Sequence, residues 1–155
     1  MDFGLCDSRV ERTFVMVKPE GIQRALVGVI IERFEKLGLQ LQALKFTKPS
    51  LAQLTDHYIE HQDRPYFNSM IEYLSNAGPV VVMVWSGPGS VALARKMIGL
   101  TDPGNSCSGS LRGDYAVSVK RTAIHGADSE NAAEREIGIW FDKQEIQKIV
   151  LQIIT

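Results

Sequence analysis

Little in this sequence of 155 residues points to an exported or membrane-spanning protein. It has two cysteines, Cys6 and Cys107, which lie far apart and in no metal-binding spacing. Neither a disulfide framework nor a zinc site is therefore predicted. No basic start followed by an apolar run indicates a secretory signal, and the longest apolar run, residues 79–85, is too short to span a bilayer. We expect a soluble, cytoplasmic protein.

A strong charge of one sign is also lacking. The formal net charge is -1 and the sequence pI is about 6.3, so no general basic field favours binding to a specific nucleic acid. Any polyanion must be bound by a local cluster of cations. Hydrophobic residues make up 45% of the chain, which is enough for one packed core in a chain too short for two. We expect a single domain over residues 11–155, after a short N-terminal extension, residues 1–10.

Hydrophobic periodicity predicts alternating strands and helices. Residues 13–17 and 79–85 are apolar on both faces, as central strands are. The expected elements are strand 13–17, helix 27–37, strand 39–43, a helix from Ser50, a short helix after Pro65, strand 79–85, helix 90–98 and strand 115–119. This order favours an α/β (α+β) fold of the ferredoxin-like split βαβ type, a four-stranded antiparallel sheet with helices packed on one face. A doubly wound sheet is the alternative.

Two local patterns imitate known sites. Residues 87–92 fit the dinucleotide fingerprint, but no second parallel strand ending in an acid follows at the required distance, so we interpret them as a strand-to-helix turn. His57 and His61 lie four residues apart, as metal ligands on a helix do. Tyr58 replaces the zincin glutamate and no third ligand is evident, so a solvated or partly packed pair is favoured.

The segment Leu100–Gly113 is longer than most connections inside a domain, and such loops are usually functional or disordered. The tripeptide Arg112-Gly113-Asp114 at its end has the integrin-binding pattern, but nothing else suggests export. A P-loop kinase is excluded, because the chain has no G-x-x-x-x-G-K-[ST] sequence.

Five dispersed residues remain as candidates for chemistry. They are Lys18 at the end of the first strand, Arg95 in a helix, Thr101 and Arg112 in the long loop, and His125 after the last strand. Each alone has an ordinary interpretation, since surface cations are usually solvated and a single histidine is more often structural. Together, three cations and a hydroxyl at strand ends and loops are typical of a polyphosphate clamp.

Four segments closely resemble the nucleoside diphosphate kinases. They are Glu11–Arg24 (ERTFVMVKPEGIQR), Asp63–Phe67 (DRPYF), Arg112–Asp114 (RGD) and Ile124–Ser129 (IHGADS). The resemblance runs from about Glu11 to Asp142, with one extra residue near Asn76-Ala77. It implies a ferredoxin-like core and ping-pong transfer from a nucleoside triphosphate, typically ATP, to a nucleoside diphosphate, with broad base tolerance. It also implies a Mg²⁺-nucleotide substrate and a homo-oligomer, a hexamer more often than a tetramer.

The resemblance also implies roles for individual residues. The catalytic set is His125, Lys18, Tyr58 and Glu136, and the substrate-binding set is Lys18, Tyr66, Arg95, Thr101, Arg112, Val119 and Thr122. An imidazole that is largely neutral at pH 7 offers a nitrogen lone pair, and Glu136 would fix its tautomer. Tyr66 would stack on the base with Val119 on its other side, and stacking does not discriminate between bases. Mg²⁺ would bridge the phosphates, so no protein metal ligand is expected.

The chain departs from the family pattern at two positions near His125. Thr122 stands where most members have the asparagine that binds the sugar hydroxyls, and Ala127 stands where a serine is usual. The serine hydroxyl is expected to hydrogen-bond the carboxylate at Glu136. The tail, Lys143–Thr155, also differs from the aromatic-rich tail of many eukaryotic members. A binding or scaffold protein with weak turnover, and a protein-histidine phosphotransferase, are the alternative functions.

Overall fold

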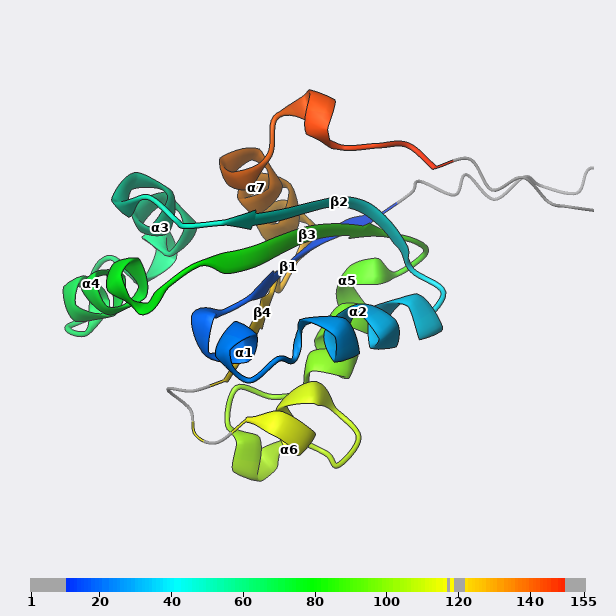
Figure 1. Ribbon diagram of the computed structural model, residues 1–155, viewed down its shortest axis with the longest axis horizontal. Coiled ribbons are helices and arrows are strands. Elements are labelled where there is room, and N and C mark those ends of the chain that lie inside the picture. Colours follow the sequence, from blue (N-terminus) through cyan, green and yellow to red (C-terminus); the bar gives the residue numbers. More distant parts are fainter. Residues whose placement is uncertain (1–10, 117, 119–121, 150–155) are drawn as a thin grey trace, which may run out of the picture.

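The centre of the molecule is a four-stranded sheet in the order β2-β3-β1-β4 (Figure 1). The computed structural model describes residues 11–116, 118 and 122–149. The strands are β1 Arg12–Val17, β2 Gln40–Thr47, β3 Val80–Ser86 and β4 Ile124–Gly126. All neighbouring strands are antiparallel, which confirms the predicted sheet and excludes a doubly wound parallel one.

Helices connect and cover the strands. They are α1 Pro19–Gln23, α2 Val27–Lys36, α3 Leu51–His57, α4 Phe67–Ala77, α5 Ser90–Ile98, α6 Leu111–Tyr115 and α7 Glu130–Trp140, with single 3-10 turns at Ile59–His61, Pro103–Asn105 and Lys143–Glu145. Strands β1 and β2 run in the same direction because both are antiparallel to β3, which lies between them. Helix α2 joins β1 to β2 and α5 joins β3 to β4, so the two βαβ units interlock in the split arrangement.

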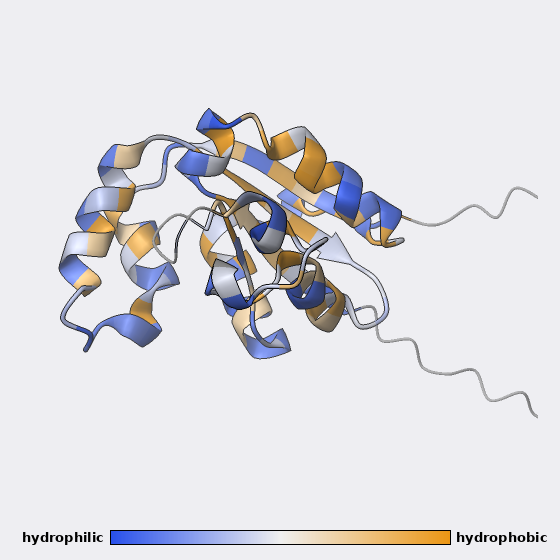
Figure 2. Ribbon diagram, turned by 90° about the horizontal axis from the view of Figure 1, so that it is seen from below, coloured by the Kyte–Doolittle hydropathy of each residue, from blue (hydrophilic) through white to orange (hydrophobic). Residues whose placement is uncertain are grey.

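Two hydrophobic clusters cover the two faces of the sheet. Phe14 and Met16 of β1 pack in one cluster with α3, α4 and α7, whereas Val15 and Val17 pack in the other with α2, α5 and α6. Figure 2 shows the central strands as largely hydrophobic, while the helices alternate between hydrophobic and hydrophilic residues. The prediction of helices on one face was therefore wrong. Central strands that are apolar on both faces require cover on both, because exposed apolar area destabilises the folded state.

Capping signals in the sequence match the helix starts. Ser50 forms a capping box with Gln53 at α3, and the Ser129 hydroxyl accepts a hydrogen bond from the Ala132 amide at α7.

The Gly87–Gly89 segment joins β3 to α5, which confirms the strand-to-helix turn. A carboxylate oxygen of Glu11 accepts from the Val91 amide at 2.6 Å. This carboxylate occupies the start of α5, where a dinucleotide phosphate would otherwise bind.

The last described strand, β4, begins after the segment where alternation predicted a strand, residues 115–119, of which residues 117 and 119 lie outside the described part of the chain. Tyr115 ends helix α6, and β4 begins only at Ile124, so His125 lies within the strand and not after it. Ser110 caps α6 by accepting from the Gly113 amide, which favours a helical turn over the five-residue alternation. Val119 lies outside the described residues.

The long connection is not a structureless loop. It contains the Pro103–Asn105 turn and the start of α6, so Arg112 lies on a helix. Asp114 accepts from Nη2 of Arg33 at 2.7 Å and from the Gly109 amide at 2.9 Å, and Arg112 is buried. The Arg-Gly-Asp tripeptide is therefore part of the packing of α6 and not a displayed loop. Across the described residues, no helix is long and apolar enough to cross a membrane.

Candidate active site

His125 lies at the middle of the short strand β4, where it pairs with Met16 of β1. Its ring faces the sheet side covered by α3 and α7, with its centroid 6.1 Å from that of Phe14 and 4.6 Å from that of His57. Lys18 follows β1 directly, as predicted, and Glu136 lies on α7. Residues far apart in the sequence therefore meet at one end of the sheet.

A hydrogen bond orients the His125 ring. Its Nε2 lies 3.1 Å from both carboxylate oxygens of Glu136, a residue that is only 4% exposed. When the Glu136 carboxylate is ionised it only accepts hydrogen bonds, so Nε2 then carries the hydrogen and Nδ1 keeps its lone pair. Within the described part of the chain, no hydrogen bond to Nδ1 is formed, and the side chain is 22% exposed. This nitrogen is available to an electrophile.

Electrostatics keep His125 neutral. Burial lowers the pKa of His125, and the charges of Lys18, Arg112 and Arg95 lower it further, while Asp128 opposes them. Burial raises the pKa of the Glu136 carboxyl. We take the histidine as neutral near pH 7, because three cations on one side of the ring disfavour a fourth.

Two cations at the site lack acidic partners among the described residues. Arg112 is 5% exposed, and its Nη1 and Nη2 donate to the carbonyl oxygens of Gly99 and Ile124, both at 3.0 Å. Burial and the nearby Arg95 lower the pKa of Arg112 to about 10. Burial and the Arg112 charge lower the pKa of Lys18 to about 8. Both remain charged at pH 7, so their mutual repulsion favours a bound anion.

A strained turn fixes the approach to His125. Ala123 has φ of 62°, and the Ile124 amide donates to the Thr122 carbonyl at 2.7 Å across it. The Ala123 carbonyl accepts from the Lys18 amide at 2.9 Å. At Gly21 a Cβ would lie 2.7 Å from this carbonyl oxygen, so only glycine allows the approach. The turn also buries Thr122, whose hydroxyl lies 3.3 Å from Nζ of Lys18.

Three buried donors near His125 have no partner among the described residues. They are the Tyr58 hydroxyl, Nε2 of His57 and Nε of Arg112. The Tyr58 ring centroid lies 6.2 Å from that of His125, and burial raises the pKa of Tyr58, so the hydroxyl keeps its proton. Unpaired buried donors are rare in folded proteins, and such a group suits a ligand with several acceptor oxygens.

Not all of the predicted site residues lie close to His125. Lys18, Tyr58, Arg112, Thr122 and Glu136 surround His125, and Arg95 on α5 acts on it electrostatically. Thr101 is exposed in the bend that follows α5. Tyr66 is 50% exposed beside α4, with its ring 6.3 Å from that of His61. The described hydrogen bonds do not link Thr101 or Tyr66 to His125.

Sequence reasoning missed His57. The expectation of a solvated or partly packed pair is met by His61, which is exposed, but not by His57, which is 3% exposed and packs against His125. Nδ1 of His57 lies 3.1 Å from Nε1 of Trp140. The available signal was the spacing of Leu54, His57 and Tyr58, which places all three on one face of the helical turn.

The only described group of three or more acids, histidines or cysteines close enough to share a metal is His57, His125 and Glu136. One ligand atom from each lies within 4.8 Å of the others. Two of the three ligands are nitrogens, whereas Mg²⁺ prefers an octahedral shell of oxygens. This group therefore does not fit a resident Mg²⁺.

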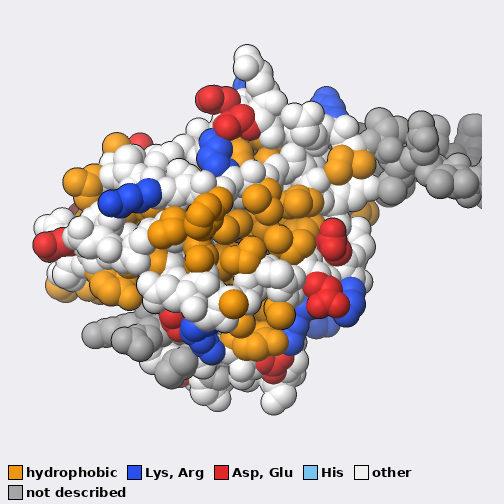
Figure 3. Space-filling view, in the orientation of Figure 1, with side chains coloured by type: hydrophobic (Ala, Val, Ile, Leu, Met, Phe, Trp, Pro, Cys, Tyr) orange, Lys and Arg blue, Asp and Glu red, His pale blue; other side chains and the backbone are white. Residues whose placement is uncertain are grey.

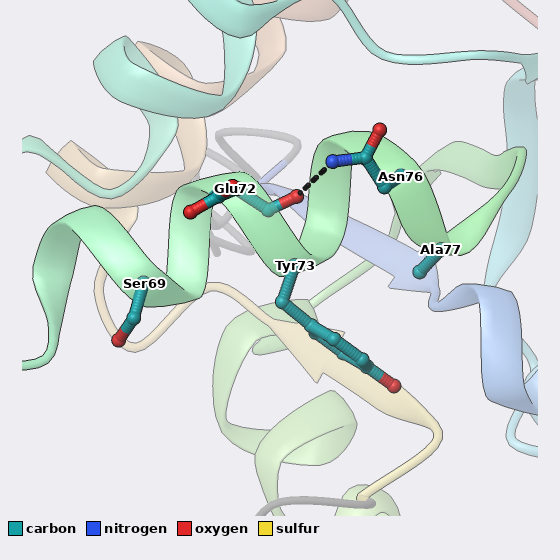
Figure 4. Close-up of a pocket in the computed structure, with 5 residues that line it drawn as sticks. All are labelled: Ser69, Glu72, Tyr73, Asn76 and Ala77. Carbon is teal, nitrogen blue, oxygen red and sulfur yellow. Dashed lines mark hydrogen bonds between the residues drawn. The ribbon is translucent and has the colours of Figure 1, made fainter.

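A separate surface hollow of about 450 Å³ runs along α4 and is lined by Ser69, Glu72, Tyr73, Asn76 and Ala77 (Figure 4). Nδ2 of Asn76 donates to the Glu72 carbonyl at 3.0 Å along the helix. The hollow is shallow, and its lining includes no nucleophile paired with a base. We therefore place the candidate active site at His125.

Comparison with known proteins identifies the family of the chain. The sequence model of the family described as nucleoside diphosphate kinase matches residues 11–146. A nucleoside diphosphate kinase of Thermosynechococcus vestitus is 51% identical over 137 residues, 88% of this chain and 91% of that protein. Nucleoside diphosphate kinase B of Rattus norvegicus is 48% identical over 139 residues, 90% of this chain and 91% of that protein.

Solved structures with the same fold include two kinases of this type. The crystal structure of a Babesia bovis nucleoside diphosphate kinase family protein superposes with a TM-score of 0.89 at 39% identity, covering 92% of this chain and 96% of that one. A halophilic nucleoside diphosphate kinase from Halobacterium salinarum, in complex with CDP, superposes with a TM-score of 0.88 at 39% identity, covering 92% and 95%.

The buried His57 predicts a pH dependence of stability. Burial, with the adjacent His125, lowers the pKa of His57 to about 3, whereas the unfolded chain has a value near 6.5. Between these values only the unfolded state binds a proton here, so stability is full above pH 6.5 and falls as the pH drops. The slope from this residue is about 1.4 kcal/mol per pH unit.

The His57→Phe variant isolates this contribution. Its free energy of unfolding, measured by urea denaturation at pH 4.5, 5.5 and 6.5, should fall less steeply with decreasing pH than that of the unmodified chain. Parallel curves for the two proteins would contradict a neutral buried His57.

Proposed function

The chain belongs to the nucleoside diphosphate kinase family, and we propose that it transfers the γ-phosphoryl group of a nucleoside triphosphate, typically ATP, to a nucleoside diphosphate through a phosphohistidine at His125. One observation carries the proposal. Nε2 of His125 is held by Glu136, while Nδ1 is free of hydrogen bonds within the described residues and lies among cations. This arrangement exposes a nucleophilic nitrogen where a polyphosphate would bind.

In the first half-reaction, the Nδ1 lone pair attacks the γ-phosphorus. A nitrogen–phosphorus bond forms, the bond from the γ-phosphorus to the bridging oxygen breaks, and the nucleoside diphosphate leaves with that oxygen. The ring gains positive charge as the bond forms. The Glu136 carboxylate, 3.1 Å from Nε2, stabilises that charge and holds the ring in line.

In the second half-reaction, a terminal oxygen of another nucleoside diphosphate attacks the phosphohistidine. The nitrogen–phosphorus bond breaks, and the imidazole returns to its neutral form. The same site thus serves donor and acceptor in turn, which gives a ping-pong mechanism.

The cations form the phosphate clamp in this proposal. Lys18, Arg95 and Arg112 offset the charge on the transferring oxygens, and the Tyr58 hydroxyl supplies a further donor. The hydrogen bonds from the Arg112 guanidinium to the backbone carbonyls of Gly99 and Ile124 support this role, because they position the guanidinium before a ligand binds.

The nucleoside is proposed to lie toward the exposed side of the site. Tyr66, half exposed beside α4, would stack on the base with Val119 opposite, and this contact tolerates any base. Thr101 and Thr122 complete the proposed substrate-binding set. The CDP bound to the Halobacterium relative supports a nucleoside diphosphate as ligand.

We propose that Mg²⁺ enters with the nucleotide as part of the substrate. The nitrogen-rich ligand set at His125 supports this, since it offers Mg²⁺ too few oxygens. We further propose a single domain over residues 11–155. A cytoplasmic location stays a prediction from the sequence.

Loss of the nucleophile should abolish transfer. The His125→Ala variant should remain folded by circular dichroism and form no phosphoenzyme with γ-labelled ATP, because the imidazole that takes the phosphoryl group is gone. The unmodified chain should release its label to unlabelled diphosphates of several bases, and initial-rate plots should be parallel. Label retained by the variant, or intersecting lines, would refute the mechanism.

Removal of a clamp cation should slow transfer strongly. Lys18→Ala and Arg112→Ala should each lower kcat/KM by about 10²-fold or more, by analogy with deletion of one preorganised donor to a transition state. Lys36→Ala is the matched control, since that side chain is 72% exposed and pairs with Glu32 on its own helix. Equal effects at all three positions would contradict the clamp, and circular dichroism should verify that the buried Arg112 can be replaced without unfolding.

We also propose that the chain forms a homo-oligomer, a hexamer rather than a tetramer. The edge strand β2 exposes Leu44 by 47% and Phe46 by 63%. Figure 3 shows hydrophobic side chains gathered over the middle of the face seen in Figure 1, between β2 and α2. An apolar area of this kind is more often buried against a partner than left in water.

Light scattering tests the assembly. Over a micromolar concentration series, the mass should be about six times the chain mass of 17.2 kDa. A stable mass of one chain would contradict the proposal, and a mass of four chains would replace the hexamer by a tetramer.

A further inference from the structure

A hydrogen bond from Trp140 fixes the tautomer of His57. Nε1 of an indole only donates, and it lies 3.1 Å from Nδ1 of His57. That nitrogen must therefore accept, so a neutral His57 carries its hydrogen on Nε2. The ring has little freedom to turn, since His57 is 3% exposed and packs edge-on against Tyr58 and His125 with centroids 4.6 Å away in each case.

The Nε2 hydrogen of His57 lacks an acceptor among the described residues. Glu136 has the opposite deficiency, because its two oxygens can accept about four hydrogen bonds and the described residues supply only that of His125. Ala127, fully buried beside this group, has no hydroxyl to offer. One ring nitrogen of His57 lies within 4.8 Å of a carboxylate oxygen of Glu136. A shift of the Glu136 side chain would bring the Nε2 donor and the carboxylate acceptor together.

We propose that His57 is a positioning residue for the transfer reaction, which donates its Nε2 hydrogen to the Glu136 carboxylate and so keeps that carboxylate ionised and directed at Nε2 of His125. The inference rests on the proposed function of His125. It extends that function to a residue that does not touch the reacting atoms and acts through Glu136.

The same tautomer argues against a metal in this cluster. A histidine nitrogen must be unprotonated to bind a metal, but the Trp140 hydrogen bond keeps the proton on Nε2 and occupies Nδ1. A metal would have to break that bond.

The pH at which Glu136 ionises should depend on the proposed hydrogen bond from His57. Other groups also act on this carboxylate: His125 on β4, Arg135 on α7, Asp128 before α7, Glu60 in the turn after α3, and the Tyr58 hydroxyl. Arg135 favours the ionised form, whereas Asp128 and Glu60 disfavour it. None of these changes when only His57 is replaced, so a shift in the acid limb of the rate measures the contribution of His57.

Two amides separate the roles of the two ring nitrogens. In His57→Gln the amide nitrogen stands where Nε2 was, so the donor to Glu136 is kept and the acceptor for Trp140 is lost. In His57→Asn the amide oxygen stands where Nδ1 was, so the Trp140 bond is kept and the donor to Glu136 is lost. A purely structural His57 is better replaced by Asn, and a positioning His57 by Gln.

The measurement is the rate of His125 phosphorylation by ATP in a single turnover, as a function of pH. His57→Gln should keep the acid limb of the unmodified chain. His57→Asn should move the limb to higher pH and lower the rate at pH 6 on the order of tenfold, with KM for the nucleotide little changed. His61→Phe, at an exposed histidine on the next turn, should leave the limb in place.

The reverse order of the two amides, or equal behaviour of both, would overturn the proposal. If either variant fails to fold, ¹⁵N-histidine NMR of the unmodified chain decides instead. Nε2 of His57 should be protonated, and Glu136→Gln should shift its resonance. Protonation at Nδ1, or no shift, would overturn the inference. Absence of any phosphoenzyme in the unmodified chain would refute the proposed function and leave the NMR test of the hydrogen bond standing.

Discussion

The position of His125 depends on a strand of only three residues. Strand β4 pairs with β1 from Ile124 to Gly126, and this register turns the His125 side chain toward α7 and the Ile124 side chain toward α5. A shift by one residue would exchange the two faces. The buried Ile124 side chain, the turn at Ala123 and the contact of its carbonyl with Gly21 all resist such a shift. Packing on the opposite face of the sheet thus sets the geometry of the site.

The cations at the site stabilise a bound anion and destabilise the protein without a ligand. Arg112 lowers the affinity of Lys18 for its proton, and Arg95 lowers that of Arg112. Both Lys18 and Arg112 favour the neutral form of His125. Buried like charges without acidic partners destabilise a fold, and the strained turn at Ala123 adds to that cost. A bound polyphosphate would relieve the repulsion and give the unpaired Tyr58 hydroxyl an acceptor. These features oppose stability but suit a phosphoryl-transfer site.

The sequence predicted the fold from features with a simple physical cause. Strands β1 and β3 are apolar on both faces, Ser50 caps α3, and Lys18 follows β1, and each of these was recognisable by period or residue type. Strands that are apolar on both faces also imply helices on both faces of the sheet, but the prediction placed them on one face. Strand β4 was missed because its three residues show no local alternation, and only their pairing with β1 defines them as a strand. At Tyr115 the capped helix α6 replaces the start of the predicted alternation.

The candidate site could be found only in part. Lys18, Arg112 and His125 lie in segments that resemble a known family. No local pattern shows that the carbonyls of Gly99 and Ile124 accept hydrogen bonds from Arg112. His57 was missed because its function depends on Trp140, 83 residues away in the sequence. The sequence around a helical histidine does not show whether its ring is hydrogen-bonded to water or to a distant indole.

The structure connects both departures from the family pattern, Thr122 and Ala127, with the groups around His125. The Thr122 hydroxyl lies within reach of Nζ of Lys18, so this side chain supports a clamp cation in addition to any contact with a nucleotide. Ala127 leaves Glu136 with fewer donors, and a carboxylate buried with few donors is harder to ionise. A chain with that alanine needs another hydrogen bond to the same carboxylate, and the imidazole of His57 is a buried group close to it that lacks a partner among the described residues.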